Sequence, residues 1–354
     1  PLAFSTPQPM TTLSEETMTL AQNSSRPLVI DGLNCAAVTR EQMLRTLEGG
    51  VSAINLTATR PQAGLHDGLL QLQQLRQTVA AMPDLARIVA SVAEIKAAHA
   101  DGVVGIIIGA QNSLMVEGDV TLLATFARLG MRIMQPTYNE RNAFGYGASF
   151  VNDGDRGITE AGRAWLAEAE ANRIVVDLSH SGMTTSAGFI AAATRPLVFS
   201  HANPYALHPS PRNKSDALIR AVADKGGLTG AVAWPPLLRF DAMPTIEDLA
   251  DHFMHLVKVG GVEHVGFGGD IPEGFPADEA KWKKMWGQDG IYPNVTGPMG
   301  DWYTYETRAT DGLSSMAQVS HIWDRLKARG LSESDVEKIM SGNWLRIMTD
   351  IWGS

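Results

Sequence analysis

The chain has few of the residues that mark several classes of protein. Cysteine occurs once in 354 residues, as Cys35, so no disulfide can form within the chain and a reducing compartment is expected. Lys and Arg total 29 against 38 Asp and Glu, and the net charge of −9 argues against nucleic acid as a partner, because that role needs a basic face. The sequence contains no run of 18 apolar residues and does not open with a basic segment followed by an apolar one. We therefore expect a cytoplasmic protein without a membrane partner.

What is present is an alternation of short apolar runs and amphipathic stretches. Such an alternation is typical of a parallel sheet with crossover helices. The apolar runs predict eight strands, at 28–31, 53–56, 105–108, 132–135, 173–178, 197–200, 228–233 and 264–268. The intervening stretches predict helices, among them 40–47, 69–80, 119–129, 160–171, 215–223 and 246–257. Eight strand–helix units over roughly 250 residues predict a (β/α)₈ TIM barrel.

An open doubly wound sheet is the alternative fold. That fold usually has a glycine-rich phosphate loop after its first strand, whereas residues 31–36 contain no Gly-x-Gly. The barrel is therefore preferred, as a single domain over residues 27–354 that follows an N-terminal arm at 1–26. Residues 271–312 are rich in Gly, Pro and aromatics and predict a loop insertion, either a substrate-covering lid or an oligomer contact. Two C-terminal helices, at 315–328 and 334–348, complete the prediction.

Two histidines close consecutive predicted strands. His180 ends 173–180 and His201 ends 197–201, an offset of one strand–helix–strand step. Parallel neighbours would bring both imidazoles to the carboxyl edge of the barrel, where barrel enzymes build their active sites. Asp270 follows the last strand and meets the same edge. Such a set can bind zinc and leave a position for water, with Asp270 handling the proton. Structural roles remain open: hydrogen bonding for the histidines and helix capping for Asp270.

Four segments, taken in order, resemble the renal (membrane) dipeptidase family: 176–180, 199–203, 211–213 and 266–270. The resemblance extends from about residue 28 to the C-terminus. Members are amidohydrolase-type (β/α)₈ zinc hydrolases that split dipeptides and are often dimers, so the resemblance implies a homodimer. It also implies His180 and His201 as ligands of one zinc. Arg212 would grip the substrate carboxylate, and Asp270 would be the acidic residue that handles the proton. Asn203, Tyr138 and Gln111 are further candidates for contact with the substrate.

The chain departs from the family at the other metal. Residues 31–35 read Asp-Gly-Leu-Asn-Cys, where the family has Asp-Gly-His-Asn-Asp with two zinc ligands. Leu33 cannot bind a metal, although Cys35 is a third candidate ligand as a thiolate. Gln111 stands for the bridging Glu, and Tyr138 for a substrate-contacting His. Because two close Zn²⁺ ions repel and need anionic ligands, we expect at most one zinc per chain.

Three functions remain open on the sequence. The first is a dipeptidase-like hydrolase of a dipeptide or a small carboxylate-bearing amide, with at most one metal. The second is a metal-free lyase or isomerase in which the histidines and Asp270 act as acid and base. The third is a non-catalytic paralogue that binds a small carboxylate-bearing molecule.

Overall fold

The computed structural model describes residues 26–150, 154–271, 273–274 and 278–353. The predicted arm at 1–26 lies outside these residues apart from Arg26. Within them, nine strands pair in parallel. They are β1 (Ile30–Asn34), β2 (Ala53–Thr59), β3 (Ala86–Val89), β4 (Val104–Ala110), β5 (Met131–Met134), β6 (Val175–Val176), β7 (Val198–Phe199), β8 (Leu228–Ala231) and β9 (Val265–Phe267).

Eight of these strands close into a barrel. One sheet runs β1-β2-β4-β5-β6 and a second runs β7-β8-β9. A parallel bridge between Asp177 and Val198 joins β6 to β7. At the other seam the backbone N–H of Asp270 donates to the carbonyl of Leu33 at 3.1 Å, which joins the end of β9 to β1. The predicted TIM barrel is therefore confirmed.

Strand β3 is the element that the sequence pattern missed, together with the following helix α4 (Val92–Ala100). β3 pairs with the first half of β4, and β5 pairs with its last residues, so both lie along one edge of β4. β3 is therefore an additional strand paired with β4, and it is not one of the eight strands that form the barrel. Two of its four residues, Arg87 and Ile88, are only half-buried, so the segment is not a continuous apolar run and the pattern did not reveal it.

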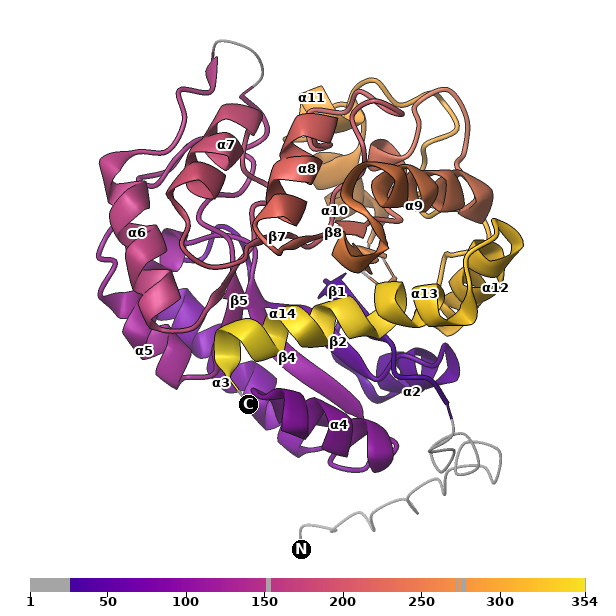
Figure 1. Ribbon diagram of the computed structural model, residues 1–354, viewed down its shortest axis with the longest axis horizontal. Helices are drawn as coiled ribbons and strands as arrows, with labels where there is room; N and C mark the ends of the chain where they lie inside the picture. The colour runs from indigo at the N-terminus through magenta and orange to yellow at the C-terminus, as the bar shows by residue number, and fades with distance from the viewer. Residues whose placement is uncertain (1–25, 151–153, 272, 275–277, 354) are drawn as a thin grey trace, which may run out of the picture.

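The helices surround the barrel and lie between successive strands (Figure 1). Several helices begin after a polar N-cap residue. Thr39, Ser91 and Ser215 are examples, and their side chains accept hydrogen bonds from backbone N–H groups in the first turn. The remaining described helices of the barrel are α2 (Arg40–Glu48), α3 (Leu65–Ala80), α5 (Leu122–Arg128), α6 (Glu160–Ala171), α7 (Met183–Ala192), α8 (Asp216–Asp224) and α9 (Ile246–Gly260).

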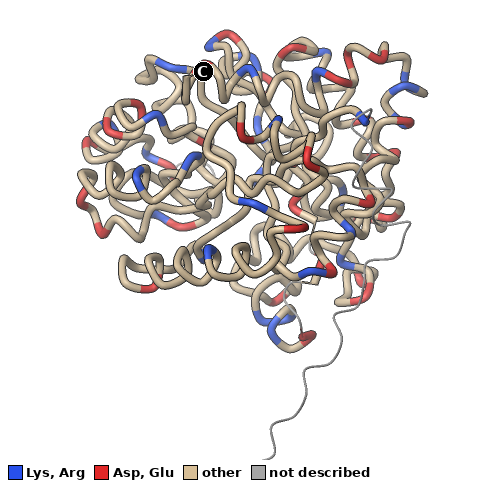
Figure 2. The backbone as a smooth tube through the Cα atoms, turned by 90° about the horizontal axis from the view of Figure 1, so that it is seen from below, with Lys and Arg blue, Asp and Glu red and all other residues tan. Residues whose placement is uncertain are grey.

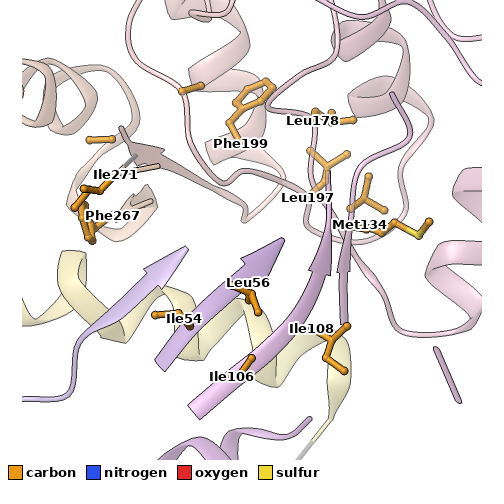
Figure 3. Close-up of a cluster of buried hydrophobic side chains, with 14 of the residues drawn as sticks. Ile54, Leu56, Ile106, Ile108, Met134, Leu178, Leu197, Phe199, Phe267 and Ile271 are labelled. Atoms are coloured by element: carbon orange, nitrogen blue, oxygen red, sulfur yellow. The ribbon is translucent and has the colours of Figure 1, made fainter. Parts of the chain in front are cut away.

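The strands bury side chains on both faces. Ile106 and Ile108 point into the layer between sheet and helices, while Ile107 lies in a separate cluster within the barrel. Figure 3 shows the outer layer, to which Ile54, Phe199 and other labelled strand residues contribute. This two-sided burial is the reason that the strand segments are continuously apolar in sequence.

The C-terminal helix α14 (Asn343–Trp352) closes the amino-terminal end of the barrel (Figure 1). Its Trp344 is fully buried against the first residues of several strands and donates from Nε1 to the carbonyl of Phe267 at 3.1 Å. A Cβ at Gly32 would lie 2.1 Å from the Trp344 ring, and one at Gly266 would lie 2.8 Å from it. Both glycines therefore let the indole approach the strands.

The C-terminal segment differs from the two helices expected. A 3₁₀ turn (Met316–Gln318) precedes α12 (Ser320–Ala328), and α13 (Glu333–Glu337) passes through a π-helical turn (Lys338–Gly342) into α14. In the segment 271–312, the described residues include two helices, α10 (Glu279–Trp286) and α11 (Pro293–Thr296).

Charged residues of both signs are interspersed around the outside of the tube in Figure 2. None of the helices in the described ranges combines the length and apolar character needed to cross a bilayer.

Asp31 lies at the seam between β1 and β9. Its Oδ1 accepts from the backbone N–H of Gly269 at 2.7 Å and of Leu33 at 3.2 Å, and its Oδ2 accepts from Asn34 at 3.1 Å. Burial raises the pKa of Asp31 to about 7 although these donors lower it. In the unfolded chain the carboxyl ionises near pH 4.

This shift predicts a pH-dependent stability. Between about pH 4 and 7 the folded Asp31 holds a proton that the unfolded chain has released, so its contribution to the free energy of unfolding falls as pH rises through this window. We expect Asp31→Asn to remove this slope. Thermal melts at pH 5 and pH 8 should show the midpoint difference, variant minus wild type, to be larger at pH 8. Equal differences at the two pH values would contradict the prediction.

Candidate functional site

A cavity of about 170 Å³ opens at the carboxyl ends of the barrel strands. Seven barrel strands contribute to its wall through residues at or after their ends. Residues 271–312 supply a second part of the wall, from α10 and the residue before α11. The lining is Cys35, Thr57, Arg60, Pro61, Gln62, Gln111, Tyr138, His180, Trp234, Asp270, Trp282, Met285, Trp286 and Tyr292. The structure thus brings Asp270, His180, Tyr138, Gln111 and Cys35 together.

The two histidines lie side by side, with ring centroids 5.0 Å apart. Nδ1 of His180 is 2.7 Å from Oδ1 of Asn139. Because an amide oxygen only accepts, Nδ1 carries the proton and Nε2 presents a lone pair. Nε2 of His180 and Nε2 of His201 are buried and have no hydrogen-bond partner among the described residues.

The proton of His201 is assigned by its neighbour Ser200. Ser200 Oγ donates to Asp177 Oδ2 at 2.5 Å, so toward Nδ1 of His201, 2.7 Å away, it acts as acceptor. His201 therefore also carries its proton on Nδ1, and its buried Nε2 presents a lone pair. Burial lowers the pKa of both histidines well below the usual range, and the Arg212 charge adds to the effect, so both rings are neutral.

Asp177 organises this arrangement, and the sequence analysis did not single it out. Its carboxylate accepts from Gln135 Nε2, from the hydroxyls of Ser179 and Ser200, and from the backbone N–H groups of the same two serines. Ser179 Oγ in turn accepts from the backbone N–H of His201. The Ser-His pair that ends both strand segments was the available signal.

Two buried basic side chains, Arg212 and Lys214, lie close to the histidines. Arg212 is 1% exposed and donates from Nη1 to the Ser179 carbonyl, whereas its Nε and Nη2 have no partner in the described part of the chain. Burial lowers the pKa of Arg212 to about 10, while the nearby Tyr138 and Asp270 raise it. Lys214 donates to the Ser181 carbonyl and lies 5.1 Å from the centre of the Phe199 ring. Burial lowers the pKa of Lys214 well below its usual range.

Cys35 and Asp270 form a pair at the cavity wall. The Cys35 thiol donates to Oδ1 of Asp270 over 3.2 Å. Burial raises the pKa of Cys35 well above its ordinary value, and the Asp270 charge raises it further, so the thiol stays protonated. Burial also raises the pKa of Asp270, against the Cys35 hydrogen bond that lowers it. Asp270 has a left-handed backbone with φ of 46°, a conformation that often occurs at functional sites.

The three remaining candidates differ in position. Gln111 donates to Thr57 Oγ1 at 2.8 Å at the cavity wall. Tyr138 stacks on His180 at 4.0 Å between ring centroids. Asn203 lies outside the cavity lining, where its amide donates to the carbonyls of Val232 and Leu237 and accepts from the Val232 N–H. Those contacts hold the loop after β7, and binding of substrate by Asn203 stays a prediction.

The side chains present do not fit the expected zinc site. Protein zinc sites take three or four ligands, whereas among the described residues around the cavity only the two imidazole Nε2 atoms of His180 and His201 are bare metal-capable nitrogens. In the ranges that the structure describes, no group of three or more His, Cys, Asp or Glu side chains could hold a metal ion. Cys35 is a protonated thiol engaged with Asp270. The buried charge of Arg212 would also repel a divalent cation beside the histidines.

A (β/α)₈ barrel whose polar side chains gather around a cavity at the carboxyl ends of its strands has the architecture of the amidohydrolase-type enzymes. Residues 22–286 match the model of the membrane dipeptidase family, peptidase family M19. The chain belongs to this family, which confirms the resemblance seen in the sequence.

Individual relatives agree with this assignment. An uncharacterised protein in the pqqA 5′ region of Klebsiella pneumoniae is 28% identical over 290 residues, covering 80% of this chain and 95% of that protein. An uncharacterised dipeptidase of Schizosaccharomyces pombe is 32% identical over 181 residues, 49% of this chain and 44% of that protein. The crystal structure of an amidohydrolase from Pseudomonas aeruginosa superposes with a TM-score of 0.84 at 29% identity, covering 96% of this chain and 99% of that one. The family and these relatives support a hydrolase function.

Proposed function

We propose that this protein hydrolyses a dipeptide or another small carboxylate-bearing amide at the barrel cavity, with at most one metal per chain. The observation that carries the proposal is a set of buried polar atoms that have no partner within the described ranges: Nε and Nη2 of Arg212, and Nε2 of His180 and of His201. A buried polar group without a partner is costly, so a ligand that satisfies the group accounts for its retention.

The roles follow from the chemistry of each group. Nε and Nη2 of Arg212 form a fork that matches a carboxylate. Hydrolysis breaks the amide C–N bond, adds the water oxygen to the carbonyl carbon and moves one proton to the leaving nitrogen. Asp270, at the cavity wall, is the group that takes and returns this proton, and a bare Nε2 of His180 accepts a hydrogen bond from the attacking water. Tyr138 and Gln111 would contact the substrate from the same wall.

Access to Arg212 involves Tyr138. Tyr138 and His180 line the cavity, whereas Arg212 and His201 do not. Tyr138 is stacked on His180 and close enough to Arg212 to raise the pKa of that guanidinium. We infer that the tyrosine side chain moves aside when a carboxylate reaches Arg212.

A second candidate is favoured by the incomplete donor set. Since the described residues around it supply two bare imidazole nitrogens, of His180 and His201, the same cavity suits a metal-free lyase or isomerase, or a paralogue that binds a carboxylate-bearing molecule without turning it over. In each case Arg212 and Asp270 keep the roles of anion binding and proton handling.

Metal content and turnover test these proposals together. Protein purified without chelator should contain one zinc per chain or less, measured by elemental analysis. A ratio near two would contradict the proposal, a ratio near one favours the one-metal hydrolase, and a ratio near zero favours the second candidate. Release of free amino acids from a dipeptide panel should be seen with wild type and lost in His201→Ala. Absence of turnover in the wild type on every dipeptide, with carboxylate binding retained, would leave the binding paralogue.

A further inference from the structure

The outer wall of the cavity is built from large aromatic side chains. Trp282, Met285 and Trp286 come from α10, Tyr292 precedes α11, and Trp234 follows β8. We call these five residues the aromatic wall. Three of them meet directly: the Trp286 ring lies 5.3 Å from the Trp234 ring and 5.3 Å from the Tyr292 ring, between centroids.

The aromatic wall connects to the polar end of the cavity. Tyr292 meets Tyr138 edge-on at 5.8 Å, and Tyr138 stacks on His180. A ligand held by the polar side chains would therefore extend toward Trp286. Trp286 and Met285 are only half-buried, so their surfaces remain open to a ligand, whereas Trp282 is 3% exposed and serves as support.

The volume of the cavity and the charged residues around it limit which ligand group can bind against the aromatic wall. An apolar cavity of about 150 Å³ is known to accept a benzene ring, and this cavity has about 170 Å³. Aromatic faces can also attract cations. Here, however, Arg60 lines the cavity, and Arg212 and Lys214 lie behind His180 and His201. Asp270 is the single acidic residue in the lining, and its Oδ1 already accepts from Cys35.

We propose that the aromatic wall selects substrates whose acyl side carries a neutral group the size of one aromatic ring. This inference rests on the proposed function for the placement of the carboxylate at Arg212. It deepens that function by naming the substrate class: N-aroyl or aromatic aminoacyl amino acids, in preference to small or cationic acyl groups.

Three probes that share a glycine carboxylate and one amide test the proposal by direct binding. They are N-benzoylglycine, N-acetylglycine and N-(4-aminobutanoyl)glycine, titrated into the full chain by calorimetry. Burying one ring should make the benzoyl compound bind about 30-fold more tightly than the acetyl compound. The aminobutanoyl compound should bind no more tightly than the acetyl one.

Variants locate the effect. Trp286→Ala should weaken the benzoyl compound about 10-fold and leave the acetyl compound unchanged, and Trp286→Phe should restore most of the loss. Trp323→Ala is the matched control, because Trp323 lies on α12 outside the cavity lining. Its Nε1 donates a hydrogen bond to Oε1 of Glu333. Equal affinity for all three probes, preference for the cationic probe, or equal loss of both neutral probes in Trp286→Ala would overturn the proposal.

The outcomes separate this inference from the proposed function. Tight benzoyl binding that depends on Trp286 but not on Arg212, or that is never followed by hydrolysis, would support the aromatic wall and contradict the proposed function. Binding that depends on Arg212 but not on the acyl group would support the proposed function and contradict selection by the aromatic wall.

Discussion

Replacing Arg212 by methionine is expected to stabilise the ligand-free protein while weakening carboxylate binding. The guanidinium is 1% exposed, and two of its nitrogens have no partner among the described residues. Removing a poorly paired buried charge in favour of an apolar side chain of similar length should raise the free energy of unfolding by about 1 to 3 kcal/mol. The midpoint of urea unfolding, measured without ligand, reports this gain.

The same substitution removes the proposed anion fork. Truncating one partner of a buried charge pair costs about 2 to 5 kcal/mol, and 1.4 kcal/mol is tenfold, so affinity for N-acetylglycine should fall about 30-fold or more. Calorimetric titration of N-acetylglycine into wild type and Arg212→Met measures this loss of affinity. Stability and binding are thus expected to change in opposite directions.

Arg132→Met is the matched control. Arg132 is part-buried but donates to the carbonyls of Ala90, Ala127 and Met131, so its guanidinium is well paired. Its loss should lower the unfolding midpoint and leave ligand affinity unchanged. If Arg212→Met lowers the midpoint in the same way, or retains carboxylate affinity, then Arg212 is a structural residue and the proposed role is wrong.

Asp177→Asn is expected to destabilise the protein by about 3 kcal/mol and to change the tautomer of His201. The carboxylate accepts five hydrogen bonds, and bonds to a charged acceptor are stronger than those to a neutral amide. The new NH₂ group is best placed at the Oδ2 position, where Ser200 can turn its hydroxyl to accept. Ser200 then donates to Nδ1 of His201, and the ring proton moves to Nε2.

The nitrogen-15 chemical shifts of the histidine rings report this tautomer. In wild type Nδ1 of His201 should be protonated, and in Asp177→Asn it should be bare. Asp155→Asn is the control, because Asp155 is also buried and accepts three bonds, from Gly157 and Thr185, none of which involves Ser200 or His201. It should lose stability and keep the wild-type shifts. If the nitrogen-15 shifts of His201 are unchanged in Asp177→Asn, then Asp177 does not set the tautomer of His201 and its role is structural.

The barrel could be recognised in the sequence because each strand is buried on both faces. Residues 105–108 and 197–200 stand out as apolar runs since the inside and the outside of the barrel both exclude water. β3 could not be recognised, because Arg87 and Ile88 are only half-buried and the segment therefore lacks a continuous apolar run. The π-helical turn before α14 is equally invisible, since it depends on how Trp344 packs into the barrel end.

The candidate site divides in the same way. The sequence by itself indicated which side chains reach the carboxyl edge, because parallel strands bring their ends to one place. It also led to the prediction that Leu33, Cys35 and Gln111 stand at metal-binding positions of the family. Only the tertiary structure decided that Nε2 of both histidines has no partner among the described residues, that Asp177 connects to His201 through Ser200, and that Tyr138 lines the cavity while Arg212 does not. The physical reason is that proton positions and buried charges depend on partners from distant strands, which meet only when the barrel closes.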